Sequence, residues 1–365
     1  MKNVKYVKWR DRWRIVWAIT RKDILEAWKN KTILTQILVV AFLIAYDHWA
    51  PALRDTPTDL FIYDPGNSQG TTQLADTPQF RLIEADTEQR LIELMDEADP
   101  GEIGLILPAD FDRALATGKA APALRGYVNW ADRFEAAALA RDFETRLAAL
   151  WGQPVQLVLA DHVVRPQPDT LGIARGSVAM MLSYAIFMLG VFMVSHLMFE
   201  EKQTQTLQAL LVSPASIGQI IAGKALTGMF YCTAAAGVVL ALKWVFVIHW
   251  ELMLLAVLCG ALFNVALGLL FGTFLENRQQ MMIWAFIPIV LLLIPVFLNV
   301  IEPLLPQGLG TLIAGLPTVA LATLFRFACT DGAPLARILG HLSLVLGSTA
   351  LLLGLVVWKV RRMDR

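Results

Sequence analysis

The 365-residue chain is poor in charged residues and in cysteine. Charged side chains make up 17% of the sequence and hydrophobic ones 56%, whereas a typical soluble domain is roughly 25% charged. This composition excludes a disordered or collagen-like chain and an ordinary cytosolic protein. The formal net charge of zero excludes a nucleic-acid-binding protein that relies on bulk positive charge. The three cysteines, Cys232, Cys259 and Cys329, are too few and too apolar in context for a disulfide framework or a cysteine zinc site.

Catalytic and metal-binding motifs are also missing. His48 and His162 each follow an aspartate but have no second ligand at the spacing of an H-E-x-x-H zinc site. The run from Gly218 to Lys224 fits the first seven positions of the phosphate-binding P-loop and then enters an apolar stretch. Ala225 stands where that motif needs the hydroxyl that binds magnesium. We therefore expect no catalytic residue, no metal site and no nucleotide site in this chain.

The zero net charge is the sum of two regions of opposite charge. Residues 1–31 hold ten basic and three acidic side chains, a net charge of +7. Residues 50–172 hold ten basic and twenty acidic side chains, a net charge of −10. A membrane is the simplest structure to lie between two such regions.

Most of the remaining sequence consists of apolar runs near the roughly 20 residues that a transmembrane helix needs. Basic residues precede the first run and follow the last, and basic residues favour the cytoplasmic side. We therefore predict a polytopic α-helical membrane protein with both termini in the cytoplasm. The loops 200–219 and 276–279 are then cytoplasmic, and the segments 50–176, 248–251 and 302–336 are external. The six predicted transmembrane helices are residues 33–49, 177–199, 220–247, 252–275, 280–301 and 337–358.

The N-terminal segment has tryptophans at helical spacing among basic residues. We interpret residues 1–31 as an amphipathic interfacial helix and residues 32–49 as the first transmembrane helix. The alternative for the first segment is a surface helix packed on another part of the protein. A signal peptide cleaved near Ala50 and Ala52 is disfavoured, because the basic region is too long for one.

Residues 50–172 alternate between strand-like and helix-like stretches, which predicts an inserted α/β extracytoplasmic domain. We expect this domain to serve recognition or gating. The predicted strands are Leu60–Tyr63, Phe80–Ile83, Ile103–Leu107, Leu124–Val128 and Val155–Leu159. The predicted helices are Thr87–Ala98, Ala109–Thr117 and Ala131–Trp151. Residues 173–365 form the remaining five-helix transmembrane domain.

A short amphipathic helix is predicted within the cytoplasmic segment 200–216. Leu207, Leu210 and Leu211 give it an apolar face, and Pro214 ends it. A helix of this kind, tied to two spans, suits docking into a groove of a partner protein. The alternative is a loop helix that only covers the ends of the spans.

The same loop resembles the cytoplasmic signature of type-2 ABC exporter permeases. That signature joins an acidic and basic cluster, a Gly-Thr, a Leu-Leu pair, a Ser-Pro or Thr-Pro and a later Gly-Lys. Gln205 and Gln208 depart from it, whereas the segments 103–115 and 316–326 resemble other parts of the family, so the resemblance covers nearly the whole chain. The matching loop residues are Glu200, Glu201, Thr206, Leu210, Leu211, Ser213, Pro214, Gly223 and Lys224.

This resemblance implies the transmembrane permease subunit of an ATP-binding-cassette exporter, in a bacterial inner membrane, for multidrug or lipid efflux. It implies two copies of a soluble ATPase, which bind ATP and magnesium, and a second permease, as a homodimer or with a paralogue. Attachment of a periplasmic adaptor stays open. The resemblance assigns contact with the ATPase to Leu207, to Lys224 and to the matched residues from Glu200 to Pro214.

Small residues recur every four positions on one face of the fourth predicted span. Gly260, Asn264, Gly268 and Gly272 form this stripe, and small residues let helices approach closely. We predict packing against another span or another protomer, with Asn264 bonding across helices. A place on the transport path is the alternative.

Charged residues are almost absent from the predicted spans, which argues against an ion-driven transporter, because ion coupling uses buried carboxylates. A path for lipids or amphipathic drugs would suit four aromatic and methionine residues, although these suit lipid-facing packing equally well. These path candidates are Met181, Phe187, Met188 and Phe286. We expect export of a hydrophobic or amphipathic substrate, and the alternative is a membrane sensor or scaffold whose external domain binds a partner without transport.

Overall fold

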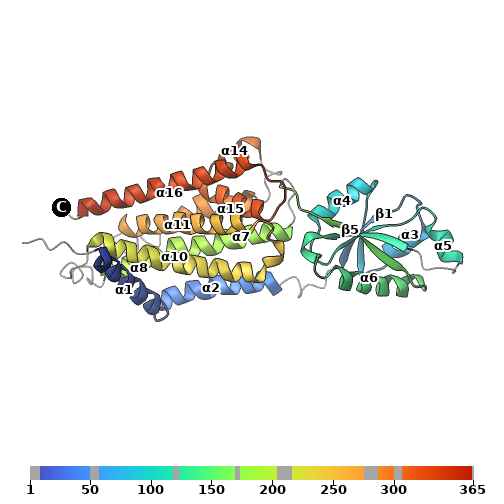
Figure 1. Ribbon diagram of the computed structural model, residues 1–365, viewed down its shortest axis with the longest axis horizontal. Coiled ribbons are helices and arrows are strands. Elements are labelled where there is room, and N and C mark those ends of the chain that lie inside the picture. The colour runs from blue at the N-terminus through green and yellow to red at the C-terminus, as the bar shows by residue number, and fades with distance from the viewer. Residues whose placement is uncertain are drawn as a thin grey trace, which may run out of the picture.

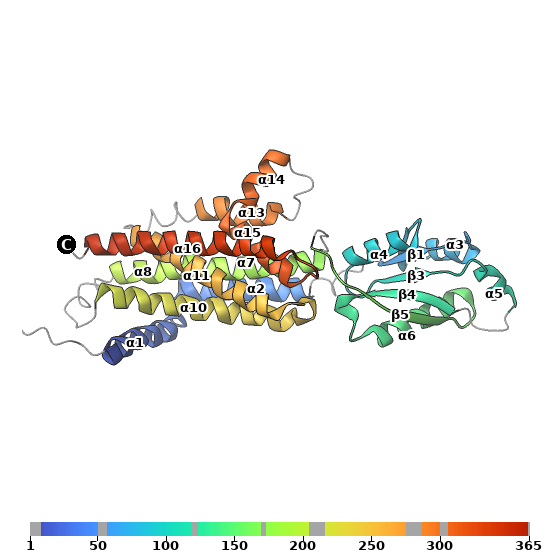
Figure 2. The same cartoon turned by 45° about the horizontal axis from the view of Figure 1, so that its top comes forward.

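The computed structural model describes residues 9–49, 57–117, 123–168, 173–203, 216–274, 287–299 and 306–363. The described residues form two parts that lie end to end, a bundle of long helices and an α/β unit (Figure 1). Helix α1 (Trp9–Ala27) and the C-terminal end of α16 (Leu335–Met363) lie at the end of the bundle away from the α/β unit, as Figures 1 and 2 show.

The α/β unit is a five-stranded sheet with helices on both faces. Its strand order is β2-β1-β3-β4-β5, and all neighbouring strands are parallel except β3 and β4. Each of the five stretches predicted as a strand is a strand. The elements are β1 (Thr58–Tyr63), α3 (Gln69–Ala75), β2 (Phe80–Glu84), α4 (Glu88–Glu97), β3 (Ile103–Ile106), α5 (Phe111–Thr117), β4 (Ala123–Asn129), η2 (Trp130–Asp132), α6 (Ala136–Trp151) and β5 (Gln156–Val164).

Side chains that alternate along the strands build one core on each face of this sheet. Leu60 of β1 packs in a core with Phe111 of α5 and Phe143 of α6. Its neighbour Phe61 points the other way and packs in a second core with Leu91 of α4. The unit is therefore a three-layer sandwich, with α4 covering one face.

Four helices in the described ranges are long and apolar enough to cross a membrane, at Gly176–Glu200, Gly218–Leu242, Trp250–Phe274 and Leu335–Arg362. Helix α2 (Lys31–Trp49) makes a fifth when it is taken with α1, from which it is bent by 74°. Only residues 287–299 of the predicted span 280–301 are described, so a sixth span stays a prediction. The bundle elements are α7 (Ile173–Phe187), the π-helix η3 (Met188–Met193), α8 (Val194–Gln203), α10 (Ile217–Leu242) and α11 (Trp250–Phe274), with α2 and α16.

Part of the segment 302–336, which was predicted to be external, packs within the bundle. Helix α15 (Pro317–Ala328) packs among α7, α11 and α16, and most of its side chains are buried. Twelve residues are too few to cross a bilayer, and this is why the sequence did not mark α15 as part of the bundle. The packing of α15 within the bundle was therefore not predicted, and the external side of the segment 302–336 stays a prediction. The short elements beside it are the π-helix η5 (Ile289–Leu293), α13 (Ile294–Leu298) and α14 (Gln307–Ala314).

Polar contacts tie the α/β unit to the near end of the bundle. The Arg133 guanidinium donates from Nη1 to the carbonyl oxygen of Val245, in the loop after α10, over 2.8 Å. Arg165 forms an ion pair with Asp331 at 3.0 Å, and the backbone N–H of Asp331 donates to Pro166. The loops that follow α10 and α15 therefore hold the unit in place.

Candidate functional site

Two of the predicted coupling residues, Glu200 and Lys224, lie toward the end of the bundle away from the α/β unit. Glu200 is near the end of α8 and Lys224 is near the start of α10, so these helices flank the loop between them. Only the backbone of Glu201 is described. The remaining predicted coupling residues lie outside the described residues, and they are Thr206, Leu207, Leu210, Leu211, Ser213 and Pro214.

A reciprocal pair of hydrogen bonds starts α10 directly after this loop. The Ser216 hydroxyl accepts from the backbone N–H of Gln219, and the Gln219 side-chain oxygen accepts from the N–H of Ser216 over 2.8 Å. This capping box satisfies amides that the first turn of a helix otherwise leaves unpaired. The run from Gly218 to Lys224, which resembles a P-loop in sequence, is therefore the beginning of a helix.

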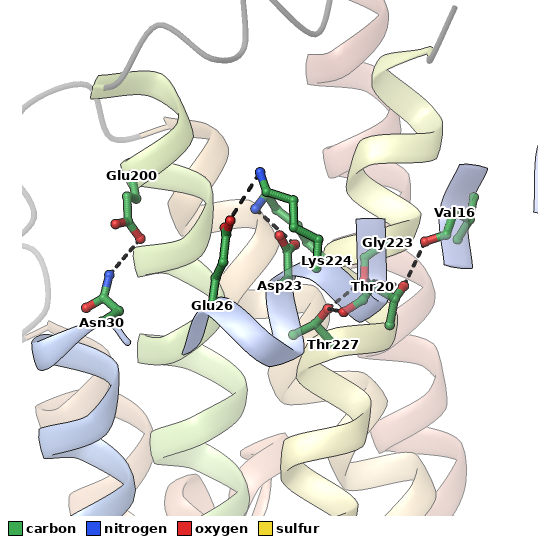
Figure 3. A network of polar contacts seen from close by, with 10 residues as sticks. Val16, Thr20, Asp23, Glu26, Asn30, Glu200, Gly223, Lys224 and Thr227 are labelled. Carbon is green, nitrogen blue, oxygen red and sulfur yellow. Dashed lines mark hydrogen bonds and ion pairs between the residues drawn. The ribbon is translucent and has the colours of Figure 1, made fainter. Parts of the chain in front are cut away.

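Helices α1 and α10 touch at Gly223. A Cβ atom at this position would lie 2.7 Å from Cγ2 of Ile19, so only glycine fits without a shift. The Thr20 hydroxyl lies 3.1 Å from the Gly223 carbonyl oxygen and 2.9 Å from that of Val16. The Thr227 hydroxyl reaches the carbonyl oxygens of Gly223 and Thr20 (Figure 3). This close approach places polar side chains of both helices in a buried contact.

Lys224 and Asp23 form a buried ion pair at this contact (Figure 3). Lys224 Nζ lies 3.3 Å from Asp23 Oδ2, and the two side chains are 1% and 4% exposed. The resemblance assigns Lys224 to contact with the ATPase. In the structure its ammonium group is buried and pairs with Asp23 of α1.

A third helix joins the junction through the turn between α1 and α2. Asn30 Nδ2 donates to Glu200 Oε2 of α8 over 2.7 Å. Asn30 Oδ1 accepts from the backbone N–H groups of Thr32 and Ile33 and so caps the start of α2. One residue therefore links the bend between α1 and α2 to α8, the helix that precedes the loop 204–215. We call the contacts of Thr20, Asp23, Asn30, Glu200, Gly223, Lys224 and Thr227 the polar junction.

The outer face of α1 is rich in tryptophan. Trp13 and Trp17 of α1 and Trp28 just after it are half or more exposed, whereas Val16 and Ala27 are buried against the bundle. One face of the described part of α1 thus packs on α10 and the other presents indole rings, and the position of that face at a membrane interface stays a prediction. Indole rings favour the membrane–water interface.

The small-residue stripe of α11 lies against the rod formed by α7, η3 and α8. A Cβ atom at Gly268 would lie 2.3 Å from the carbonyl oxygen of Gly190, and one at Gly272 would lie 2.6 Å from Met198 Cβ. At Gly260 it would meet Leu321 of α15 at 2.6 Å. These glycines therefore pack α11 against other helices of the same chain.

Asn264 does not bond across helices as predicted. Its Nδ2 donates to the Gly260 carbonyl oxygen, one turn earlier in α11, over 2.8 Å. The cross-helix hydrogen bond comes from Ser195, whose hydroxyl lies 2.9 Å from the Gly268 carbonyl oxygen.

The path candidates occupy different environments. Phe187 is 1% exposed and lines a small cavity inside the bundle. Met181 and Met188 are partly buried and pack against the hydrophobic core of the bundle. Phe286 lies outside the described residues. Of the described three, Phe187 is thus the one placed at an internal cavity.

The bundle with its inserted α/β unit matches a known transporter family. A family model of ABC-2 family transporter proteins matches residues 31–358, which covers both parts of the structure. The chain belongs to the ABC-2 transporter family. It is an ABC transporter permease, a multi-pass membrane protein.

Two curated relatives in this family are similar over most of their length. The permease is 26% identical over 295 residues to the probable multidrug ABC transporter permease YbhR of Escherichia coli strain K12. The same protein of Escherichia coli O157:H7 gives the same identity. The alignments cover 74% of this chain and 78% of each relative. No solved structure matches the chain.

Sequence reasoning missed four residues of the permease's polar junction, one of which, Thr227, lies within the predicted span 220–247. Thr20 and Asp23 lie in a segment interpreted from its tryptophans and basic residues, and Asn30 lies in the turn that follows. A polar or acidic residue every third or fourth position within an amphipathic helix was the available signal, since such spacing marks one face. The partners are about 200 residues away, as the separation of 201 between Asp23 and Lys224 shows.

Proposed function

We propose that this permease is the transmembrane subunit of an ABC exporter that moves a hydrophobic or amphipathic substrate out of the cytoplasm or the inner leaflet. A separate ATPase, in two copies, binds ATP and magnesium and drives two permease chains, which are identical or paralogous. The proposal places α1 and the C-terminal end of α16 in the cytoplasm and the α/β unit on the extracytoplasmic side of a bacterial inner membrane.

The polar junction carries this proposal. The loop proposed to dock on the ATPase leaves the bundle at α8 and returns at α10. Glu200 at the end of α8 contacts Asn30, and Lys224 at the start of α10 contacts Asp23. A displacement of the loop therefore acts directly on α1 and on the start of α2. This gives the ATPase a mechanical connection to four helices through side chains that are already in contact.

The substrate class is supported by the lining of the bundle and by a relative. Among the described residues, the ion pairs and most exposed charges lie in the α/β unit or near helix ends, and the core of the bundle is apolar. An apolar core disfavours ions and sugars and suits molecules that partition into the bilayer. The name of the curated relative, a probable multidrug permease, supports drug-like substrates.

The test is purification of the full permease with a candidate ABC ATPase subunit, followed by ATPase assays in lipid nanodiscs with lipids and drugs. Leu207→Asp combined with Leu211→Asp removes the apolar face of the proposed docking helix, so ATPase binding and stimulation should both be lost. Leu312→Asp combined with Leu335→Asp is a matched control, because both leucines are exposed and lie near the opposite end. A permease that binds no ATPase and stimulates none would instead be a sensor or scaffold.

A further inference from the structure

A small cavity lies where five elements of the bundle converge, namely α7, α11, η5, α13 and α15. It is lined by Ser183 and Phe187 of α7, Asn264 of α11, Leu292 of η5, and Thr318 and Leu321 of α15. Asn264 is near the middle of α11, so the cavity lies far from both ends of that helix. It has room for a group about the size of one water molecule.

Two polar atoms in the cavity wall have no partner. The Ser183 hydroxyl and Asn264 Oδ1 are buried and form no hydrogen bond with the described residues, and the two residues are 5% and 1% exposed. The orientation of the Asn264 amide is set by its bond from Nδ2 to Gly260, which leaves Oδ1 as an acceptor toward the cavity. A buried polar atom without a partner is costly, so the wall favours an occupant that donates a hydrogen bond.

The start of α15 lies beside the same cavity, because Thr318 in its first turn lines it. The Thr318 hydroxyl donates to the carbonyl oxygen of Leu292 over 2.7 Å, which leaves its lone pairs able to accept. The cavity therefore offers donors and acceptors together, and its lining residues are uncharged.

One wall of the cavity is thin and irregular. It consists of η5 and α13, a π-helix followed by a short α-helix. The opposite side of this wall is exposed at Leu291, Ile294 and Phe297. π-Helical turns hydrogen-bond less regularly than an α-helix and occur often at functional sites. A displacement of this wall would open the cavity to an amphipathic molecule in the surrounding lipid.

We propose that Ser183, Asn264 and Thr318 form a binding subsite for the hydroxyl group of an uncharged amphipathic substrate. A hydroxyl donates to Asn264 Oδ1 and accepts from the Ser183 hydroxyl, and it fits the cavity as it stands. The alkyl part of the molecule lies along the displaced wall of η5 and α13. This subsite rests on the proposed exporter function, to which it adds the polar group that the substrate carries. A resident water offers the same chemistry, so the test must separate the two.

The test uses the full permease in nanodiscs without an ATPase. One photolabel is a medium-chain alkanol that carries a diazirine, and the other is the same molecule without its hydroxyl. The alkanol should label α7, η5 and α15 saturably, with competition by octanol and not by octane, whereas the alkane should label outer surfaces without saturation. Ser183→Ala should weaken the saturable labelling roughly tenfold, as loss of a buried hydrogen bond does. Asn264→Ala should have a similar effect.

Ser195→Ala is the matched control. Ser195 is a second buried serine of the same rod of helices, but its hydroxyl bonds to Gly268 and Val191 and does not line the cavity. The Ser195→Ala variant should be labelled by the alkanol as strongly as the wild type. If Asn264→Ala does not fold, Ser183→Ala carries the test because it removes a single oxygen atom.

The outcomes separate the subsite from the exporter function. The subsite is overturned if the alkanol and the alkane label the permease equally, or if Ser183→Ala leaves the labelling unchanged. A cavity that holds only water gives this result. If the permease still stimulates ATPase activity and exports substrate when the subsite is overturned, the exporter function holds. Labelling as predicted, in a permease that associates with no ATPase, supports the subsite and removes the exporter function.

Discussion

Lys224 Nζ lies 3.3 Å from Asp23 Oδ2 in a contact that solvent hardly reaches. A buried ion pair contributes little net stability but is expensive to break from one side, because the remaining charge stays buried and unpaired. Asp23 and Lys224 therefore act as a register between α1 and α10. Their pairing favours the relative position of the two helices that the structure has, because any other position would separate two buried charges.

We expect Asp23→Asn and Lys224→Met each to destabilise the permease by about 3–5 kcal/mol, the cost of an unpaired buried charge. The double variant should be more stable than the sum of the two single effects predicts, because it leaves no charge behind. Thermal unfolding of the purified permease measures all three. If the free energy of unfolding of each single variant is within about 0.5 kcal/mol of the wild type, the ion pair is exposed to water rather than buried.

The sequence predicts which regions of the permease are membrane helices better than it predicts what joins them. α10, α11 and α16 stand out because each is apolar over a length that spans a bilayer. Helix α15 has the same apolar character over twelve residues, and no length criterion distinguishes it from an external helix. Its place in the bundle follows from tertiary packing, in which Leu321 fills the space above Gly260.

The α/β unit shows the same limit. The five strands follow from alternation and apolar content, whereas α3 was not predicted. Seven mostly polar and small residues form this helix. It is supported from outside by Asp64, whose carboxylate accepts from the hydroxyls of Ser68 and Thr71, and by Phe111, which lies against Gly70. Support of this kind is tertiary, and periodicity within the segment does not reveal it.

The glycine stripe gives a second prediction. Gly268→Ala should destabilise the permease by about 1–3 kcal/mol, as overpacking does in a close contact, because the new methyl group meets the backbone of Gly190 and Val191 and no flexible side chain can move aside. Gly237→Ala is the matched control, since nothing lies within 4 Å of that position and alanine favours a helix. Unfolding temperatures of both variants measure the difference. Equal temperatures would show that α11 and η3 are farther apart than the structure has them.

A third prediction concerns pH. Burial raises the pKa of the Glu102 carboxyl from its ordinary 4.5 to about 7. The hydrogen bond from the backbone of Asp99 opposes this rise, and the carboxylates of Asp59 and Asp99 add to it. Folding therefore favours the protonated form. The resulting stability of the α/β unit is fully present below about pH 4.5 and is lost as the pH rises through about 7.

Glu102→Gln should remove this pH dependence. The variant should be more stable than the wild type at pH 8, by about 1 kcal/mol for a partly exposed group, and the difference should shrink toward pH 5. Hydrogen exchange of β1 and β3 at the two pH values measures it. Asp86→Asn, at an exposed position, should show no such dependence, and a Glu102→Gln variant that behaves in the same way would contradict the assignment.

The last prediction concerns the attachment of the α/β unit to the bundle. The Arg133 guanidinium donates to Val245 over 2.8 Å and to its own neighbour Trp130 over 2.6 Å, and it stacks on the rings of Trp130 and Phe134 at 4.2 and 4.3 Å. The planar, multiply donating guanidinium makes these contacts together, which a lysine ammonium cannot do. Arg133→Lys should therefore loosen the unit almost as much as Arg133→Ala, although it keeps the charge.

A looser attachment would appear in both variants as a broader distribution of distances between a spin label on α6 and one at the start of α11, the end nearer the α/β unit. Arg141→Lys, on the same unit but outside these contacts, is the control and should leave the distribution narrow. If Arg133→Lys keeps the wild-type distribution, charge alone holds the unit, and the ion pair of Arg165 with Asp331 becomes the stronger attachment. If both Arg133 variants broaden the distribution and also lower substrate-stimulated ATPase activity, then the position of the α/β unit contributes to transport, because Arg133 contacts only the end of the bundle farthest from the polar junction.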